Sequence, residues 1–247
     1  MQAPSVVSPS VVSPSVVAGE VARFDALASR WWDPNGPMRP LHRMNPARVE
    51  WITTRIATRF ADPGAVRLLD VGCGAGLAAE ALVRRGYAVV GIDAAGEAIE
   101  AARAHAAGHG LGIDYRAVAA ETLVASGEKF PVITALEVIE HVADPEAFLR
   151  TLADLLAPRG LLFISTLNRT RRSFVVAKLG AEYLLRLLPV GTHDWKKFVT
   201  PAELATGARR AGLHVADMAG MTPNKLAGGW HAGRDLGVNY IAMAERP

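Results

Sequence analysis

The sequence is poor in cysteine, with Cys73 as its single example. One thiol excludes an internal disulfide and a zinc site built from cysteine thiolates, and it suits a chain that stays in the cytoplasm. Uninterrupted apolar runs of about 18 residues, which a membrane-spanning helix needs, are also missing. Because the first residues contain neither a basic region nor a continuous apolar core, we expect no secretory signal peptide.

An excess of charge of one sign is missing as well. The 27 Lys and Arg residues nearly balance the 24 Asp and Glu residues, which leaves a formal net charge of +3. This mild basic excess is too weak to indicate a nucleic-acid partner, and we expect none. Half of the 247 residues are apolar, so the chain can bury the core of one α/β domain of ordinary size.

The N-terminal residues differ in pattern from the rest of the chain. Residues 4–17 repeat Pro-Ser-Val-Val with a period of five, and proline at every fifth place forbids a helix. We therefore expect a disordered tail at 1–18 and a single domain at 19–247, with an insertion at about 169–198. Helical patterns within 19–60 predict two helices before the first strand, the second beginning near Asn45 with Pro46 in its first turn.

Glycines gather directly after a short β-branched run. Residues 66–71 are typical of a buried strand, and residues 77–85 of a helix rich in Ala and Leu. Between them stand Gly72, Gly74 and Gly76, which let backbone N–H groups approach a ligand at the helix N-terminus. The third glycine comes one residue too early for the dinucleotide fingerprint. Asp93 ends the next predicted strand about 20 residues later, where a carboxylate accepts hydrogen bonds from ribose hydroxyls.

The stretch from Leu69 to Gly76, together with Asp93, resembles the first motifs of the class I S-adenosylmethionine-dependent methyltransferases. A generic nucleotide-binding Rossmann turn is the alternative. The resemblance implies an α/β fold with a Rossmann-like, seven-stranded sheet, whose last two strands, 213–219 and 238–244, form a reversed hairpin. Trp230 and His231 would then lie in the loop between those strands, and the two N-terminal helices would cap the cofactor cleft.

Acidic and imidazole side chains follow the fourth predicted strand, residues 132–136. Leu136 ends that strand and is expected to line the cofactor cleft, and Glu137, Glu140 and His141 come next, at the sheet edge where open α/β sheets bind ligands. Their spacing of i, i+3 and i+4 places them on one face if the turn is helical. Two carboxylates and an imidazole can hold a divalent ion. Equally, His141 and Glu140 can be catalytic, supplying a general base for a hydroxyl proton.

A strongly apolar stretch covers residues 173–188. Its charges, Lys178, Glu182 and Arg186, recur every four residues and form one narrow stripe. The basic residues that flank it are Arg169, Arg171, Arg172, Lys196 and Lys197. A helix with a broad apolar face and basic flanks suits the surface of an anionic membrane. A buried helix, packed on the sheet or at a dimer interface, is the alternative.

Six further segments match one narrower pattern. They are 28–33, 40–46, 165–169, 180–183, 191–194 and 238–240. With them the chain, from about residue 20 to its end, resembles the ubiquinone-biosynthesis O-methyltransferases, which methylate polyprenyl-dihydroxybenzoate or hydroxylated polyprenyl-quinol intermediates. The resemblance implies S-adenosylmethionine as cofactor, with contacts at Arg48, Gly72, Asp93 and Leu136; the family often has Met where Leu136 stands.

The same resemblance implies a lipid-tailed catechol as substrate, a location in the cytoplasm on the inner face of the membrane, and a place in a quinone-synthesis complex or a homo-oligomer. It implies Mg²⁺ at Glu137, Glu140 and His141. One catechol hydroxyl would lose its proton to His141, or through the ion, and its oxygen would attack the methyl carbon in line. The rival functions are O-methylation of another, soluble phenol, a nicotinamide oxidoreductase and a non-catalytic scaffold.

Overall fold

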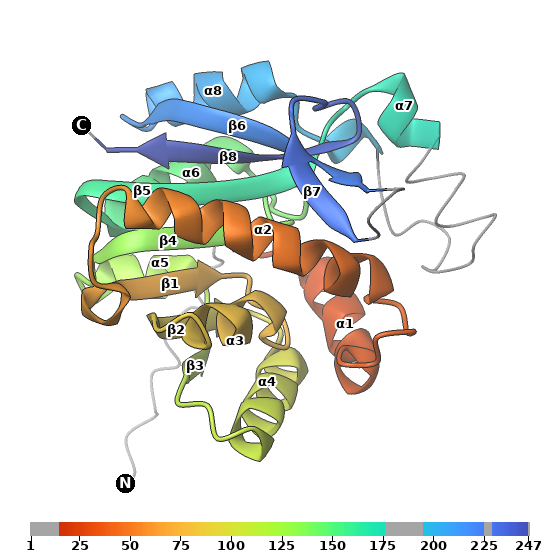
Figure 1. Ribbon diagram of the computed structural model, residues 1–247, viewed down its shortest axis with the longest axis vertical. Helices are drawn as coiled ribbons and strands as arrows, with labels where there is room; N and C mark the ends of the chain where they lie inside the picture. Colours follow the sequence, from red (N-terminus) through yellow and green to blue (C-terminus); the bar gives the residue numbers. More distant parts are fainter. Residues whose placement is uncertain (1–14, 176–194, 225–228, 247) are drawn as a thin grey trace, which may run out of the picture.

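The computed structural model describes residues 15–175, 195–224 and 229–246. Most of the expected tail and most of the apolar stretch 173–188 lie outside these residues. The described residues form one eight-stranded sheet with the order β3-β2-β1-β4-β5-β8-β6-β7 (Figure 1). Its strands are β1 Arg67–Val71, β2 Ala88–Asp93, β3 Asp114–Ala117, β4 Phe130–Leu136, β5 Leu156–Leu167, β6 His214–Pro223, β7 Trp230–Gly233 and β8 Asn239–Glu245.

The direction of the strands matches the expected class of fold. Strands β1 to β5 pair in parallel, whereas β8 runs antiparallel to β5, and β6 antiparallel to β8. The α/β sheet with a reversed hairpin is therefore confirmed. The count of seven strands is wrong, because residues expected in a loop form β7. Trp230 pairs with Pro223 and His231 with Thr222, and Trp230 also packs against the core beneath α2.

Helices cover both faces of the sheet. They are α1 Ala18–Leu27, α2 Arg39–Ala57, α3 Leu77–Val83, α4 Gly96–Gly108, α5 Ala120–Ala125, α6 Pro145–Leu155, α7 Arg171–Ser173 and α8 Pro201–Arg210. Successive strand residues point to opposite faces. Leu68 accordingly belongs to the core shared with α2, α3 and α4, and its neighbour Leu69 to the core shared with α5, α6 and α8. The sheet thus lies between two helical layers.

The second helix begins earlier than the sequence predicts. Helix α2 has Pro40 in its first turn and Pro46 in its interior. Proline fits the start of a helix because no N–H bond is lost there, and it is Pro40, not the expected Pro46, that occupies this position. Inside the helix, Pro46 removes one backbone hydrogen bond. The helix continues because its core-facing side, including Val49, Ile52 and Ile56, is buried.

Helix α1 is attached to the body of the domain from outside. None of its residues is buried, and its N-cap residue, Val17, makes no side-chain hydrogen bond to the first turn. Asp25 of α1 accepts a hydrogen bond from the backbone of Glu97 at the start of α4, at 2.9 Å. Phe24 and Leu27 pack against a small apolar cluster around Trp31 and Met38. Contacts of this kind place α1 across the carboxyl end of the sheet.

Candidate active site

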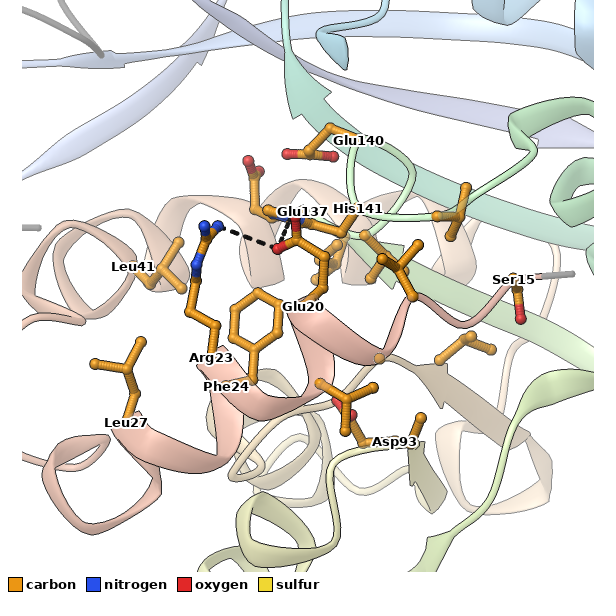
Figure 2. Close-up of a pocket in the computed structure, with 18 of the residues that line it drawn as sticks. Ser15, Glu20, Arg23, Phe24, Leu27, Leu41, Asp93, Glu137, Glu140 and His141 are labelled. Atoms are coloured by element: carbon orange, nitrogen blue, oxygen red, sulfur yellow. Dashed lines mark hydrogen bonds and ion pairs between the residues drawn. The ribbon is translucent and has the colours of Figure 1, made fainter. Parts of the chain in front are cut away.

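A cavity of about 340 Å³ opens between α1 and the carboxyl ends of the central strands. Val71 of β1, Ile92 of β2, Leu136 of β4 and Leu167 of β5 line its floor. Figure 2 shows α1 running along this cavity, with Glu20 and Phe24 rising from the helix toward the side chains that follow β4. The predicted site residues Gly72, Asp93, Leu136, Glu137, Glu140 and His141 all line the cavity.

The glycine turn between β1 and α3 has the backbone that its sequence predicts. Gly72, Gly74 and Gly76 all have positive φ angles, of 67°, 53° and 89°. At Gly74 a Cβ atom would lie 2.1 Å from Cζ2 of Trp31, so no other residue fits without displacing that ring. The turn also holds Asp93, because the backbone N–H of Gly74 donates to its Oδ2 at 2.8 Å.

Asp93 faces the cavity as a fixed acceptor. Its Oδ1 accepts from the backbone N–H of Ala95 at 2.8 Å, which complements the bond from Gly74 to Oδ2. Burial raises the pKa of this carboxyl above its usual value, although these two backbone bonds oppose the rise. Each carboxylate oxygen can accept a second hydrogen bond. The site can therefore bind a pair of ribose hydroxyls, as the sequence predicts.

Unpartnered polar atoms surround the glycine turn. Five buried side-chain atoms of the described residues lack a hydrogen-bond partner: Trp31 Nε1, Asn45 Oδ1, Arg48 Nε, Asp70 Oδ2 and Tyr115 Oη. Buried polar groups are normally satisfied, so their gathering points to a polar ligand. The two nitrogens can donate to a carboxylate, and the Asn and Asp oxygens can accept from an ammonium group. By its chemistry this set of donors and acceptors suits the amino-acid end of S-adenosylmethionine, although of the five residues Trp31 alone lines the cavity.

Arg48 is placed differently from the other expected cofactor contacts. It lies on α2 with only 4% of its side chain exposed, and its Nη1 is 3.4 Å from Oε1 of Glu137. Arg48 is not among the residues that line the cavity. Its Nε has no hydrogen-bond partner among the described residues, and the expected contact between Arg48 and the cofactor stays a prediction.

The three residues after β4 lie in a turn that is not helical, so the condition for a shared helical face is not met. Glu137 has a positive φ of 58°, a left-handed conformation that interrupts any helix. The backbone N–H of His141 then donates to the carbonyl of Val138 at 2.8 Å and closes a turn. The Glu137 carboxylate accepts from Ser165 Oγ at 2.7 Å, and Glu140 accepts from Thr166 Oγ1 at 2.9 Å. The carboxyl end of β5 thus orients both acids.

The electrostatics of this turn are unusual. Glu140 is 4% exposed, and burial, followed by the charge of Glu137, raises the pKa of its carboxyl to about 7. Burial lowers the pKa of His141, but the hydrogen bond to Glu20 and the charges of Glu140, Glu20 and Glu137 outweigh it, so the pKa is raised overall. Perturbed pKa values of this kind in a cleft are typical of acid–base sites.

Nothing in the sequence indicates Glu20, although its carboxylate is the hydrogen-bond partner of the His141 imidazole. Its Oε2 lies 3.1 Å from His141 Nδ1. That hydrogen bond, opposed by burial and aided by the charges of His141, Arg23 and Lys197, lowers the pKa of Glu20 to about 2. A single acid on a short amphipathic helix carries no recognisable pattern, and its partner lies 121 positions away.

Metal-ligand atoms do not converge on the expected residues. Among the described residues, the one group whose ligand atoms all lie within 4.8 Å of one another is Glu80, His105 and His109, away from the cavity. Both oxygens of Glu80 are already used, by Arg84 at 2.9 Å and by His105 at 2.6 Å. The two imidazoles stack with centroids 4.1 Å apart at 28°, and Nδ1 of His109 is hydrogen-bonded to the backbone carbonyl of His105 at 2.8 Å. This group is better explained as packing.

Comparison with known proteins gives a consistent result. A family model described as a methyltransferase domain matches residues 41–217. A ubiquinone biosynthesis O-methyltransferase from Parvibaculum lavamentivorans is 52% identical over 235 residues, which cover 92% of this chain and 93% of that protein. One of the same name from Methylobacterium nodulans is 50% identical, over 92% of this chain and 94% of that protein.

Solved structures support the fold. Magnesium protoporphyrin IX methyltransferase from Synechocystis PCC 6803, with bound SAH, superimposes with a TM-score of 0.64. The two chains are 18% identical, and the match covers 92% of this chain and 94% of the other. At this level of identity the likeness concerns the fold alone, which is that of the class I methyltransferases.

Proposed function

Because the chain belongs to the ubiquinone biosynthesis O-methyltransferases, we propose that its cavity brings S-adenosylmethionine and a lipid-tailed catechol together, with His141 as the base. The chain is an S-adenosylmethionine-dependent O-methyltransferase of ubiquinone biosynthesis. The proposal concerns the residues that carry this activity. The observation that supports it most is the position of the His141 imidazole, which lines the cavity and is hydrogen-bonded through Nδ1 to the Glu20 carboxylate.

The residues around the glycine turn would bind the cofactor. Bound S-adenosylmethionine supplies a methyl group activated by a positively charged sulfur. Asp93 would accept from the ribose hydroxyls, and Leu136 would form an apolar wall. Trp31 would donate to the carboxylate end, and Arg48 would join it once its side chain turns toward the cavity. The unpartnered oxygens of Asn45 and Asp70 would accept from the ammonium.

His141 would take the proton of one catechol hydroxyl. A general base within hydrogen-bond reach of the proton contributes a factor of ~10² to 10⁴ in rate. The raised pKa of the imidazole makes its neutral form a stronger proton acceptor. Glu140, whose pKa of about 7 is near neutral pH, is the second titratable group next to His141. Holding the oxygen and the methyl carbon in line, in a cavity that excludes water, would account for much of the remaining rate.

Magnesium is the alternative way of activating the catechol hydroxyl, since an imidazole nitrogen that binds the ion cannot also take the proton. Glu137, Glu140 and His141 would be the residues to hold Mg²⁺. Burial and then the charge of Glu137 raise the pKa of Glu140, and a cation placed beside these two carboxylates would favour their ionised forms. Their ligand atoms must first converge, since no such grouping exists at this turn in the described residues. There the ion would make a catechol hydroxyl more acidic.

The substrate and the location are proposed from the lining and the flanks of the cavity. Apolar residues from α1 and its surroundings, including Val17, Val21, Leu41 and Val142, line the cavity and suit a lipid tail. No helix among the described residues is long and apolar enough to cross a membrane. We infer that the 173–188 stretch and its basic flanks rest on the inner face of an anionic membrane, where the substrate is dissolved. Quinone-synthesis partners, or a second copy, would assemble at the same surface.

One assay tests the substrate class and the ion. Methyl transfer from labelled S-adenosylmethionine to a short-chain polyprenyl catechol is measured with anionic vesicles, before and after EDTA. Turnover that disappears with EDTA and returns with Mg²⁺ supports both. Turnover indifferent to EDTA keeps the substrate and removes the metal. If the cofactor binds but only soluble phenols are methylated, the alternative substrate class is correct.

A further inference from the structure

The imidazole of His141 is held by two side chains of one helix. Glu20 Oε2 lies 3.1 Å from His141 Nδ1. Phe24, four residues later, packs edge-on against the imidazole, with ring centroids 5.2 Å apart at 86°. Residues i and i+4 share one face of a helix, so α1 presents both side chains to the same ring. In Figure 2 Glu20 and Phe24 point from α1 toward His141.

The Glu20 carboxylate is surrounded by cations. Arg23 Nη1 is 3.1 Å from its Oε2, and Lys197 Nζ is 3.5 Å from its Oε1. Only 15% of the Glu20 side chain is exposed. These cations keep the acid ionised, and an ionised carboxylate can only accept hydrogen bonds. The donor in the contact with His141 must therefore be the Nδ1–H group of the imidazole.

We propose that Glu20 is a positioning residue for methyl transfer, acting through His141. By accepting Nδ1–H it selects the neutral tautomer whose lone pair is on Nε2. The inference rests on the proposed role of His141 as the base. As the catechol O–H bond breaks, its proton goes to Nε2. The oxygen forms its bond to the methyl carbon while the carbon–sulfur bond breaks and leaves its electron pair on sulfur. Glu20 stabilises the imidazolium that results.

A purely structural role for Glu20 is the competing explanation. Helix α1 has no buried residue of its own, and Glu20 also links it to Lys197. If Glu20 only docks α1, its loss should loosen the whole cavity and weaken the binding of substrate and cofactor. If it positions His141, its loss should act on the chemical step and leave binding nearly unchanged.

The experiment compares Glu20→Ala and Glu20→Gln with the control Arg30→Gln, which changes an exposed charge in the same N-terminal cap. It measures kcat and KM for a short-chain polyprenyl catechol, and the Kd of SAH by calorimetry. We expect E20A to lower kcat by about 10- to 100-fold, as the loss of a carboxylate behind a functional histidine does. KM and Kd should stay within about twofold. E20Q, whose amide oxygen still accepts Nδ1–H, should restore part of kcat, and R30Q should match the wild type.

A second readout reports the tautomer directly. Nitrogen-15 NMR of labelled histidine distinguishes protonated from unprotonated ring nitrogens, and comparison with His141→Ala assigns the signals. We expect Nδ1 of His141 to be protonated in the wild type and in E20Q, and the proton to shift toward Nε2 in E20A.

The kinetic and NMR results together separate the role of Glu20 from that of His141. An E20A variant with normal kcat, or with raised KM and Kd and an unchanged tautomer, overturns the role of Glu20. If H141A is inactive in that case, the role of His141 as the base still holds and only the role of Glu20 is rejected. If H141A keeps its turnover, both roles are rejected.

Discussion

Replacing the buried Asp70 by asparagine should stabilise the protein and weaken its cofactor site. Asp70 precedes the glycine turn and is 2% exposed. Its Oδ1 accepts from Thr134 Oγ1 at 2.6 Å, whereas its Oδ2 has no partner among the described residues. Burial raises the pKa of this carboxyl from 3.8 to about 6, against the Thr134 bond and the charge of Arg48, which lower it.

The magnitude follows from that pKa. Because the folded pKa is the higher one, the ionised group destabilises the fold above pH 6, and this effect fades as the pH falls toward 3.8. The difference between the two values corresponds to ~3 kcal/mol. Asparagine keeps the acceptor for Thr134 but leaves an unpartnered amide donor, which costs ~1 to 3 kcal/mol. The expected net gain at neutral pH is ~1 kcal/mol, or about 2–4 °C in Tm.

The same substitution removes the proposed acceptor for the cofactor ammonium. A hydrogen bond to a charged group contributes ~1.5 to 3 kcal/mol, so SAH should bind about 10- to 100-fold more weakly. Thermal unfolding followed by circular dichroism and calorimetry with SAH measure the two effects. The control is Asp114→Asn, which removes an exposed carboxylate bonded to Arg116 and should leave SAH binding unchanged. A D70N protein that is less stable at neutral pH, or that binds SAH normally, would refute the reasoning.

Three more predictions concern the same cavity. The value of kcat/KM should rise with pH along a limb set by His141, because a protonated imidazole cannot take a proton and Glu20 helps raise its pKa above 6.5; a flat profile from about pH 5 to about pH 9 would contradict this. Gly74→Ala should lose ~2 to 4 kcal/mol in urea unfolding, because φ is positive and Trp31 lies in the way; unchanged stability would show that the ring moves freely. Trp32→Phe removes the Nε1–H bond to the Ala75 carbonyl of the glycine turn at 3.0 Å and, by loosening that turn, should weaken SAH binding about fivefold in calorimetry; an unchanged Kd would show that this bond does not hold the turn for the cofactor.

The glycine turn and the position of Asp93 at the cavity could be predicted because their determinants are local. Gly72, Gly74 and Gly76 are spaced by one residue each, and the strand before them and the helix after them have clear patterns. Asp93 follows by the rule that parallel strands end at the same edge. The start of α2 was harder to predict, because proline is favoured in the first turn of a helix and either Pro40 or Pro46 could have marked that turn. Tertiary packing decides between them.

The catalytic half depends on contacts between distant segments. Glu20 and His141 are 121 positions apart, and Glu137 and Ser165 are 28 apart. The sequence around each of these residues gives no indication of the hydrogen bond that it forms. Glu137, Glu140 and His141 share no helical face, because Glu137 adopts a left-handed backbone. The three residues all line the cavity, and the end of β5 orients the two acids.

The most direct test of the account is methyl transfer to a short-chain polyprenyl catechol by the wild type and by His141→Ala, with the Kd of SAH measured on the same samples. The account predicts a loss of ~10² to 10⁴ in kcat with SAH affinity nearly unchanged. A His141→Ala enzyme that binds SAH and methylates the catechol at the wild-type rate would contradict it.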